Sequence, residues 1–198
     1  MITKSEYYKI ASQWKGKAYQ KYKKLKKRIP MIEKNIEFFR NAKLLELGCN
    51  GGMYALHLYP YVKSYTGIEV DKHYYKQALV TLNGKEVIVI NDSFQNVDLI
   101  KLDFDLFIAS YVLHHLNEKE IDKLNFVFEK CNKVAIHTRS GDPLRYGHSE
   151  VGYDPIPKWE NSRIKKMLDN HGYKNELYLC SKNDYNGIYL ILAEKDEN

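Results

Sequence analysis

Apolar residues follow two alternating patterns along this chain, short continuous runs and longer stretches with a repeat of three or four positions. Five runs have the length of buried strands: 43–47, 64–69, 86–91, 105–110 and 133–138. Four stretches have the spacing of amphipathic helices: 53–61, 71–82, 118–131 and 159–171. Asp71 stands where it would cap its helix, and Gly172 where it would end the last one. The alternation predicts an α/β fold with a doubly wound, mostly parallel sheet covered on both faces.

The two ends of the chain depart from this alternation. Segments 173–181 and 187–193 read as two last strands, which predict a C-terminal β-hairpin and seven strands in all. The charged tail 194–198 is expected to fray. Residues 5–39 read as one or two helices, ended or restarted at Pro30. We therefore predict an N-terminal helical cap over residues 1–40 and a body over residues 41–198.

Positive charge is concentrated near the N-terminus. The net charge is +6, but nine Lys or Arg and no Asp or Glu lie between Tyr7 and Ile32, so the rest of the chain is slightly acidic. One interpretation is a surface helix with solvated lysines. The other is an arm, Lys15 to Arg28, that attracts RNA or an acidic small substrate.

Bulk composition is that of an ordinary globular domain. The chain has 198 residues, of which 44% are hydrophobic and 28% charged, and no apolar run approaches the length of a membrane span. Its three cysteines are far apart, without a zinc-type spacing or a disulfide framework. These features predict a cytoplasmic protein with neither a metal site nor a membrane partner, and they leave its oligomeric state open.

The strand at 43–47 leads into the glycine-rich turn Gly48-Cys49-Asn50-Gly51-Gly52. Such a turn lets the backbone approach a ligand and aims unpaired N–H groups at it. Glu69 follows the next strand, where a carboxylate accepts hydrogen bonds from ribose hydroxyls. The turn contains no Lys or Arg and lacks the dinucleotide spacing, so the predicted ligand is a nucleoside without phosphates.

These residues resemble the first motif of class I S-adenosylmethionine-dependent methyltransferases. Glu46, Gly48 and Gly52 match its acidic residue and its outer glycines, and Asn50 replaces the middle glycine. Asparagine tolerates a left-handed backbone, so the turn can keep its shape. The resemblance runs from about Lys43 to Thr138 and implies a Rossmann-like methyltransferase fold.

Three further segments resemble later motifs of the same family. Gly67-Ile68-Glu69 is similar to the second motif, Asn91-Asp92-Ser93-Phe94 to the third, and Asp105 to Leu116 to the fourth. The resemblance implies that Glu69 holds the ribose and that Asp92 accepts from the adenine amino group. It implies S-adenosylmethionine (SAM) as cofactor, S-adenosylhomocysteine (SAH) as product, and these cofactor-binding residues: Glu46, Gly48, Cys49, Asn50, Gly52, Glu69, Val70, Asp92, Ser93, Phe94, Ser110 and Tyr111.

Methyl transfer requires mainly alignment and exclusion of water, with a general base where the acceptor holds a proton. His115 and His148 are the candidate bases, although any single histidine is more often structural than catalytic. Aromatic and arginine side chains suit recognition of a ring and an anion, with ordinary packing as the alternative. The candidate substrate-binding residues are Tyr8, Trp14, Arg139, Arg145 and Tyr146.

Three functions are compatible with these features. The first is a SAM-dependent methyltransferase that acts on an oxygen or nitrogen of a small-molecule acceptor. The second is an RNA methyltransferase, for example on tRNA, which uses the basic N-terminal helix to contact phosphates. The third is a non-catalytic domain that binds SAM.

Overall fold

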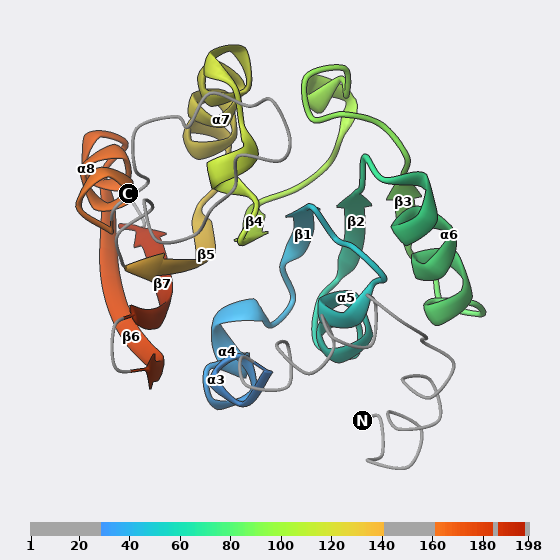
Figure 1. Ribbon diagram of the computed structural model, residues 1–198, viewed down its shortest axis with the longest axis horizontal. Coiled ribbons are helices and arrows are strands. Elements are labelled where there is room, and N and C mark those ends of the chain that lie inside the picture. The colour runs from blue at the N-terminus through green and yellow to red at the C-terminus, as the bar shows by residue number, and fades with distance from the viewer. Residues whose placement is uncertain (1–28, 141–160, 184–185, 197–198) are drawn as a thin grey trace. The chain divides into compact units, whose positions relative to one another are not determined.

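The computed structural model describes residues 29–140, 161–183 and 186–196. Seven strands form the sheet (Figure 1): β1 Lys43–Leu47, β2 Ser64–Ile68, β3 Ile88–Ile90, β4 Leu106–Ser110, β5 Lys133–Ser140, β6 Tyr173–Asn183 and β7 Asn186–Lys195. Their order is β3-β2-β1-β4-β5-β7-β6, so the chain reverses its direction of winding after β3. The predicted doubly wound sheet with an antiparallel C-terminal hairpin is confirmed.

The chain divides into two compact units, Met1–Leu106 and Phe107–Asn198. The described helices of the first are α3 Ile29–Lys34, α4 Ile36–Phe39, α5 Met53–Leu58, α6 Lys72–Thr81 and the 3-10 turn η1 Leu99–Lys101. Those of the second are the 3-10 turn η2 Leu113–His115, α7 Glu118–Lys130 and α8 Asn161–Asn170.

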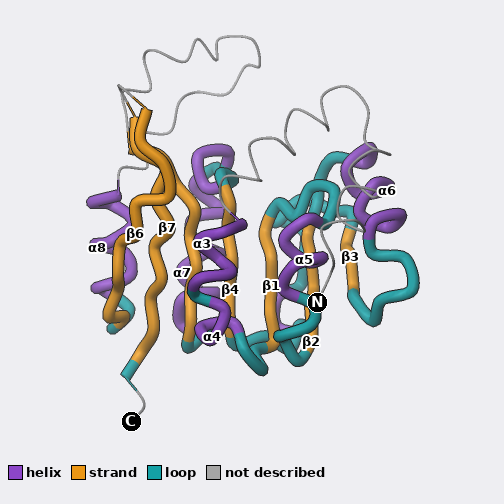
Figure 2. The backbone as a smooth tube through the Cα atoms, turned by 90° about the horizontal axis from the view of Figure 1, so that it is seen from below, coloured by secondary structure: helices purple, strands orange, loops and turns teal. Residues whose placement is uncertain are grey.

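In the first unit, the three parallel strands form the base on which the loops are held. Leu44 pairs with Tyr65 and Glu46 with Gly67 between β1 and β2, and β2 pairs with β3 in the same direction. Figure 2 shows these strands side by side with α6 next to β3, and α6 contacts both β3 and α5. Because strands covered by helices are removed from water, four of the five residues of β1 are fully buried, as expected from its apolar run.

Two helices begin as the sequence predicts. The Asp71 carboxylate accepts from the backbone N–H groups of His73 and Tyr74, at 2.7 and 3.2 Å, and so caps α6. Asn117 and Glu120 form a reciprocal capping box at the start of α7.

In the second unit, β7 pairs antiparallel with both β5 and β6. The expectation of a frayed tail is wrong for its first two residues, since β7 continues to Lys195. The Lys195 backbone N–H donates to the Asn132 carbonyl, and its ammonium donates to the carbonyls of Phe128 and Glu129. These bonds satisfy carbonyls at the end of α7 and hold the last strand in place.

Several predicted boundaries differ from the structure; the helix predicted over 53–61, for example, ends at Leu58, and the strand predicted over 133–138 runs to Ser140. The strand predicted over 86–91 is reduced to Ile88–Ile90, since Val87 turns back to the carbonyl of Lys85 and only β2 pairs with this edge strand. The hairpin strands run to Asn183 and from Asn186, so the predicted turn over 182–186 is too long. The N-terminal helical stretch is interrupted at Asn35, whose amide donates to the Met31 carbonyl at 2.8 Å.

Helices α3 and α4 bury Ile32 and Phe39 completely. The predicted division into a cap over 1–40 and a body over 41–198 stays a prediction, because residues 1–28 lie outside the described part.

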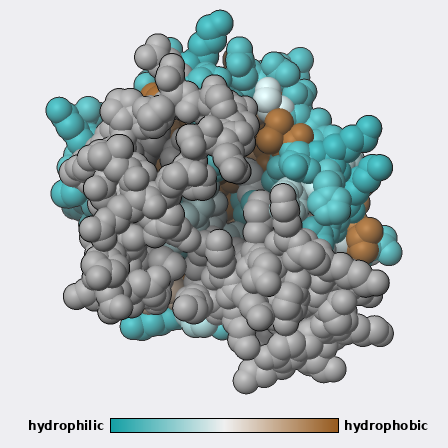
Figure 3. Space-filling view, viewed as in Figure 1, coloured by the Kyte–Doolittle hydropathy of each residue, from teal (hydrophilic) through white to brown (hydrophobic). Residues whose placement is uncertain are grey.

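On the face shown in Figure 3, the described residues that are visible are mainly hydrophilic, with hydrophobic colour in small spots. Within the described ranges, no helix is both long and apolar enough to cross a membrane.

Candidate cofactor-binding site

The glycine-rich turn between β1 and α5 has an alternating left-handed backbone. Gly48, Asn50 and Gly52 have φ angles of 69°, 49° and 79°. Asn50 adopts this conformation without being a glycine, and its side-chain amide donates to the Gly48 carbonyl at 2.7 Å. The substitution in the first motif therefore keeps the turn, as the sequence predicts.

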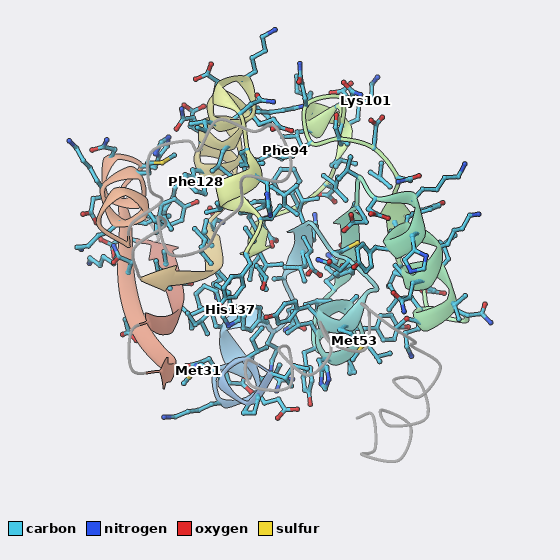
Figure 4. The ribbon with its side chains drawn as sticks, viewed as in Figure 1. Met31, Met53, Phe94, Lys101, Phe128 and His137 are labelled. Carbon is cyan, nitrogen blue, oxygen red and sulfur yellow. The ribbon has the colours of Figure 1, made fainter. Side chains whose placement is uncertain are left out.

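Gly52 packs closely against the end of α6. A Cβ atom at this position would lie 2.9 Å from Leu82 Cδ1 and 3.5 Å from the backbone of Ala78. A side chain would add strain to this collision, because the φ angle is positive. Met53 opens α5 immediately afterwards and is buried (Figure 4).

Glu69 fastens this turn to the end of β2. One carboxylate oxygen accepts from the Asn50 backbone N–H at 2.8 Å, and the other accepts from the Asp71 backbone N–H at 2.9 Å. The residue is 5% exposed.

The end of β3 is tied to the same place by Asn91. Its side-chain amide donates to the Glu69 carbonyl at 2.8 Å, and the Glu69 backbone N–H donates to the Ile90 carbonyl at 2.9 Å. The ends of β2 and β3 therefore lie next to each other. Val70, which follows Glu69, is 68% exposed and offers an apolar side chain beside them.

The segment after Asn91 is shaped by Asp92. Its Oδ1 atom accepts from the Ser93 backbone N–H at 2.7 Å and from the Asn96 amide at 2.9 Å. Phe94 is buried, whereas Lys101, further along the same connection, lies at its outer edge (Figure 4).

A cluster of titratable side chains lies beneath the turn. The Tyr65 hydroxyl donates to Glu46 Oε2 at 2.6 Å, and the Cys49 thiol interacts with the same hydroxyl. Burial raises the pKa of Glu46 to about 8, against the lowering effect of the Tyr65 hydrogen bond. Burial also raises the pKa of the Cys49 thiol well above its ordinary value. This shift favours the uncharged carboxylic acid form of Glu46 at neutral pH.

Three predicted site residues are described in the second unit. Tyr111, at the end of β4, has a φ of 56°, and its backbone N–H donates to the carbonyl of His137, a buried residue of β5 labelled in Figure 4. A left-handed tyrosine is uncommon, and such backbone strain concentrates at functional sites. Ser110 is buried on β4, and His115 is exposed on η2.

The structure describes only the backbone of one further candidate and nothing of the others. Arg139 lies on β5, where it pairs with Ile188, and its side chain is outside the described part. The remaining candidates and the basic arm also lie outside the described residues: Tyr8, Trp14, Arg145, Tyr146, His148 and the segment from Lys15 to Arg28.

The sequence analysis included Gly67 and Asn91 only as members of the second and third motifs, without a role of their own, and did not single out Tyr65. Asn91 was recognisable as an amide directly after a strand. Tyr65 and Gly67 form a tyrosine–any–glycine pattern within one strand, and only the pairing with β1 reveals its use.

The residues at the ends of β1, β2 and β3 fit a nucleoside-type cofactor. The turn has glycine backbone in left-handed conformations, the Glu69 carboxylate lies at the end of β2 next to it, and Glu46 Oε1 is buried with no hydrogen-bond partner among the described residues. The first unit alone supplies these features.

A family model described as "Methyltransferase domain" matches residues 45–136. No curated protein sequence matches the chain significantly. Among solved structures, magnesium protoporphyrin IX methyltransferase from Synechocystis PCC 6803 with bound SAH is similar, with a TM-score of 0.66, 12% identity and coverage of 96% of this chain and 93% of that one.

Two further solved structures have comparable similarity. For N-methyltransferase NodS from Bradyrhizobium japonicum WM9, the TM-score is 0.64 at 16% identity, covering 86% of this chain and 97% of that one. For the N-terminal domain of EvdMO1 with SAH bound, it is 0.65 at 18% identity, covering 84% and 80%. At these identities the solved structures establish the fold.

Proposed function

The chain carries a class I SAM-dependent methyltransferase domain, and from this premise we propose that it methylates an oxygen or nitrogen atom of a small-molecule acceptor. The observation that carries the proposal is the turn 48–52, with three left-handed residues fastened to Glu69. Solved structures of the same fold support a small acceptor, since one is an N-methyltransferase and another a magnesium protoporphyrin IX methyltransferase.

Residues of the first unit would hold the cofactor. The Glu69 carboxylate is an acceptor suited to the two ribose hydroxyls, and the Asp92 carboxylate to the adenine amino group. Val70 and Phe94 are the apolar candidates for contact with the ring. The backbone N–H groups of Gly48, Cys49, Asn50 and Gly52 already donate within the protein, so the turn would contribute close approach of its glycine backbone. When bound, SAM supplies a methyl group on a positively charged sulfur, which is already a good leaving group.

The protein's remaining task is alignment and proton removal. His115, exposed on η2, is the candidate general base among the described residues, and His148, the other candidate, lies outside them. Such a base takes the proton of a hydroxyl or ammonium group as the acceptor atom becomes nucleophilic. Arg139, Arg145 and Tyr146, with Tyr8 and Trp14, are the candidates for holding the acceptor.

RNA as acceptor is the second candidate, favoured by the uneven charge of the chain. Nine Lys or Arg and no acidic residue lie between Tyr7 and Ile32. Such a segment contacts phosphates and makes binding depend steeply on salt.

Calorimetric titration of the full chain with SAM and with SAH tests the function first. We expect roughly micromolar dissociation constants for both, and failure of both with a folded protein would contradict the proposal. Labelled SAM then reports methyl transfer to fractions of small metabolites and of RNA.

Charge reversal distinguishes the two acceptor classes. Reversing the lysines between Lys21 and Lys27 should leave small-molecule methylation intact but abolish RNA methylation. Reversal of exposed lysines elsewhere, such as Lys72, Lys76 and Lys166, is the matched control. Methylation of RNA alone, lost only in the N-terminal variant, would overturn the small-molecule proposal.

A further inference from the structure

Tyr65 reaches Glu46 because of the register of the first two strands. Leu44 pairs with Tyr65 and Glu46 with Gly67, so these four residues lie on the same face of the sheet. Gly67 stands between Tyr65 and the end of β2 and has no side chain. The Tyr65 ring therefore extends along the strand, past Gly67, until its hydroxyl meets the Glu46 carboxyl at 2.6 Å.

The space above Gly67 is filled by this cluster. A Cβ atom at residue 67 would lie 2.8 Å from both the Cys49 sulfur and the Tyr65 oxygen. Cys49 belongs to the glycine-rich turn, so the hydroxyl touches the strand below and the turn above. The exposed fractions of Glu46, Tyr65 and Cys49 are only 0%, 2% and 3%.

Only one of the two oxygens of the Glu46 carboxyl has a hydrogen-bond partner among the described residues. Oε2 accepts the Tyr65 hydroxyl, whereas Oε1 is buried with no hydrogen-bond partner in the described structure. An unpaired buried polar atom is costly. Burial, the dominant cause, raises the pKa of Glu46 to about 8, and the nearby negative charge of Glu69 adds to this. The cofactor-free cluster therefore retains a proton at neutral pH.

We propose that Tyr65 is a positioning residue that holds Glu46 beneath the turn and thereby couples cofactor binding to release of the Glu46 proton. The inference rests on the proposed SAM-binding function. SAM carries two positive groups and one negative group, so its net charge is positive. When SAM binds next to Glu46, this positive charge favours the ionised form of the Glu46 carboxyl. Glu46 then loses its proton to the solvent, and the Tyr65 hydrogen bond stabilises the resulting charge.

The sign of the pH effect follows from this coupling. Because binding releases a proton, affinity for SAM rises with pH and levels off above the pKa of cofactor-free Glu46, about 8. The titratable groups that act on Glu46 are Tyr65 and Glu69, and Cys49 interacts with all three. The Cys49 and Tyr65 groups stay protonated, because burial raises both pKa values.

Calorimetric titration with SAM, between about pH 6 and about pH 9 and in buffers with different ionisation enthalpies, tests the coupling. We expect the wild-type protein to release a proton on binding. Glu46→Gln should release none beyond the ligand's own, and its affinity should follow only the ligand's titration. Tyr65→Phe should bind roughly tenfold more weakly at neutral pH, with its plateau displaced to higher pH.

Tyr173→Phe is the matched control, since it removes another buried tyrosine hydroxyl, on β6. It should leave the pH profile of SAM binding unchanged. If the affinities of Tyr65→Phe and wild type change in parallel with pH, or if Glu46→Gln releases the same number of protons as wild type, the inference is overturned while the proposed function stands. If wild type binds neither SAM nor SAH, both are overturned.

A measurement on the cofactor-free protein needs no activity. The infrared band of a protonated carboxyl should be present in the wild type at neutral pH and disappear as pH rises past about 8. The band should be missing in Glu46→Gln and persist to higher pH in Tyr65→Phe. Absence of this band in a folded wild type would contradict the inference.

Discussion

Two buried tyrosine hydroxyls, one in each unit, donate to acceptors of different kinds. The Tyr173 hydroxyl donates to the backbone carbonyls of Phe128 and Cys131, at 2.9 and 2.7 Å, where α7 ends. The Tyr65 hydroxyl donates to a side chain, Glu46, that can gain or lose a proton. Backbone carbonyls at a helix end accept hydrogen bonds at every pH. A carboxyl group only accepts when it is ionised, and it also donates when it is protonated.

The difference separates a structural hydrogen bond from one suited to function. Around Tyr173, the Lys195 ammonium shares the Phe128 carbonyl at 2.7 Å. Around Tyr65, one oxygen of Glu46 is buried with no partner among the described residues. A folded protein tolerates such an atom at a cost, and the cost is reduced when a ligand brings charge or a donor.

The largest expected effect concerns Glu46 and pH. Its pKa is about 8 in the folded protein and roughly 4.3 in the unfolded chain. Between these values the folded state holds a proton that the unfolded state has lost. Wild type should therefore lose stability relative to Glu46→Gln as pH rises through this range, by up to about 1.4 kcal/mol per pH unit, and no further above about pH 8.

Urea unfolding of both cofactor-free proteins across this range measures the difference, in which contributions of other groups cancel. If the unfolding free energies of wild type and Glu46→Gln change in parallel with pH, the pKa of Glu46 is not raised. The hydrogen bond of Tyr65 would then be structural, like that of Tyr173.

The next effect concerns Glu69 and cofactor affinity. Glu69→Ala removes the predicted ribose acceptor and releases the backbone N–H groups of Asn50 and Asp71. We expect a loss of about 3 kcal/mol in SAM binding, from hydrogen bonds to a charged group. Calorimetric titration measures it. Glu37→Ala, which removes an exposed carboxylate paired only with Arg40 in the described contacts, is the control and should bind normally. Normal binding by Glu69→Ala would remove this residue from the site.

The smallest effect concerns Tyr173. Tyr173→Phe removes the donor to the Phe128 and Cys131 carbonyls. The Phe128 carbonyl still accepts from the Lys195 ammonium. We expect a loss of about 1–3 kcal/mol in the free energy of unfolding, measured with denaturant, and no change in SAM affinity. A fall in SAM affinity for this variant would end the distinction between the two tyrosines.

Local patterns predicted most of the architecture. Strands, helices and their order follow from spacing and from caps such as Asp71, because these signals arise between residues close in sequence. Errors occurred where distant partners decide. Residues 86–91 have the composition of a strand, but as an edge they pair with β2 over only three residues. Lys195 looked like part of a frayed tail until α7 supplied carbonyls for its ammonium.

The sequence by itself determined the backbone conformation of the glycine-rich turn 48–52. Left-handed backbone favours glycine and asparagine, so the residue types at Gly48, Asn50 and Gly52 are enough to predict this conformation. Only the tertiary structure decided the setting of Glu46. Its charge depends on burial and on Tyr65, which is 19 positions away in sequence and is brought to it by the register of two parallel strands. Pairing and burial arise between distant segments, so no local pattern records them.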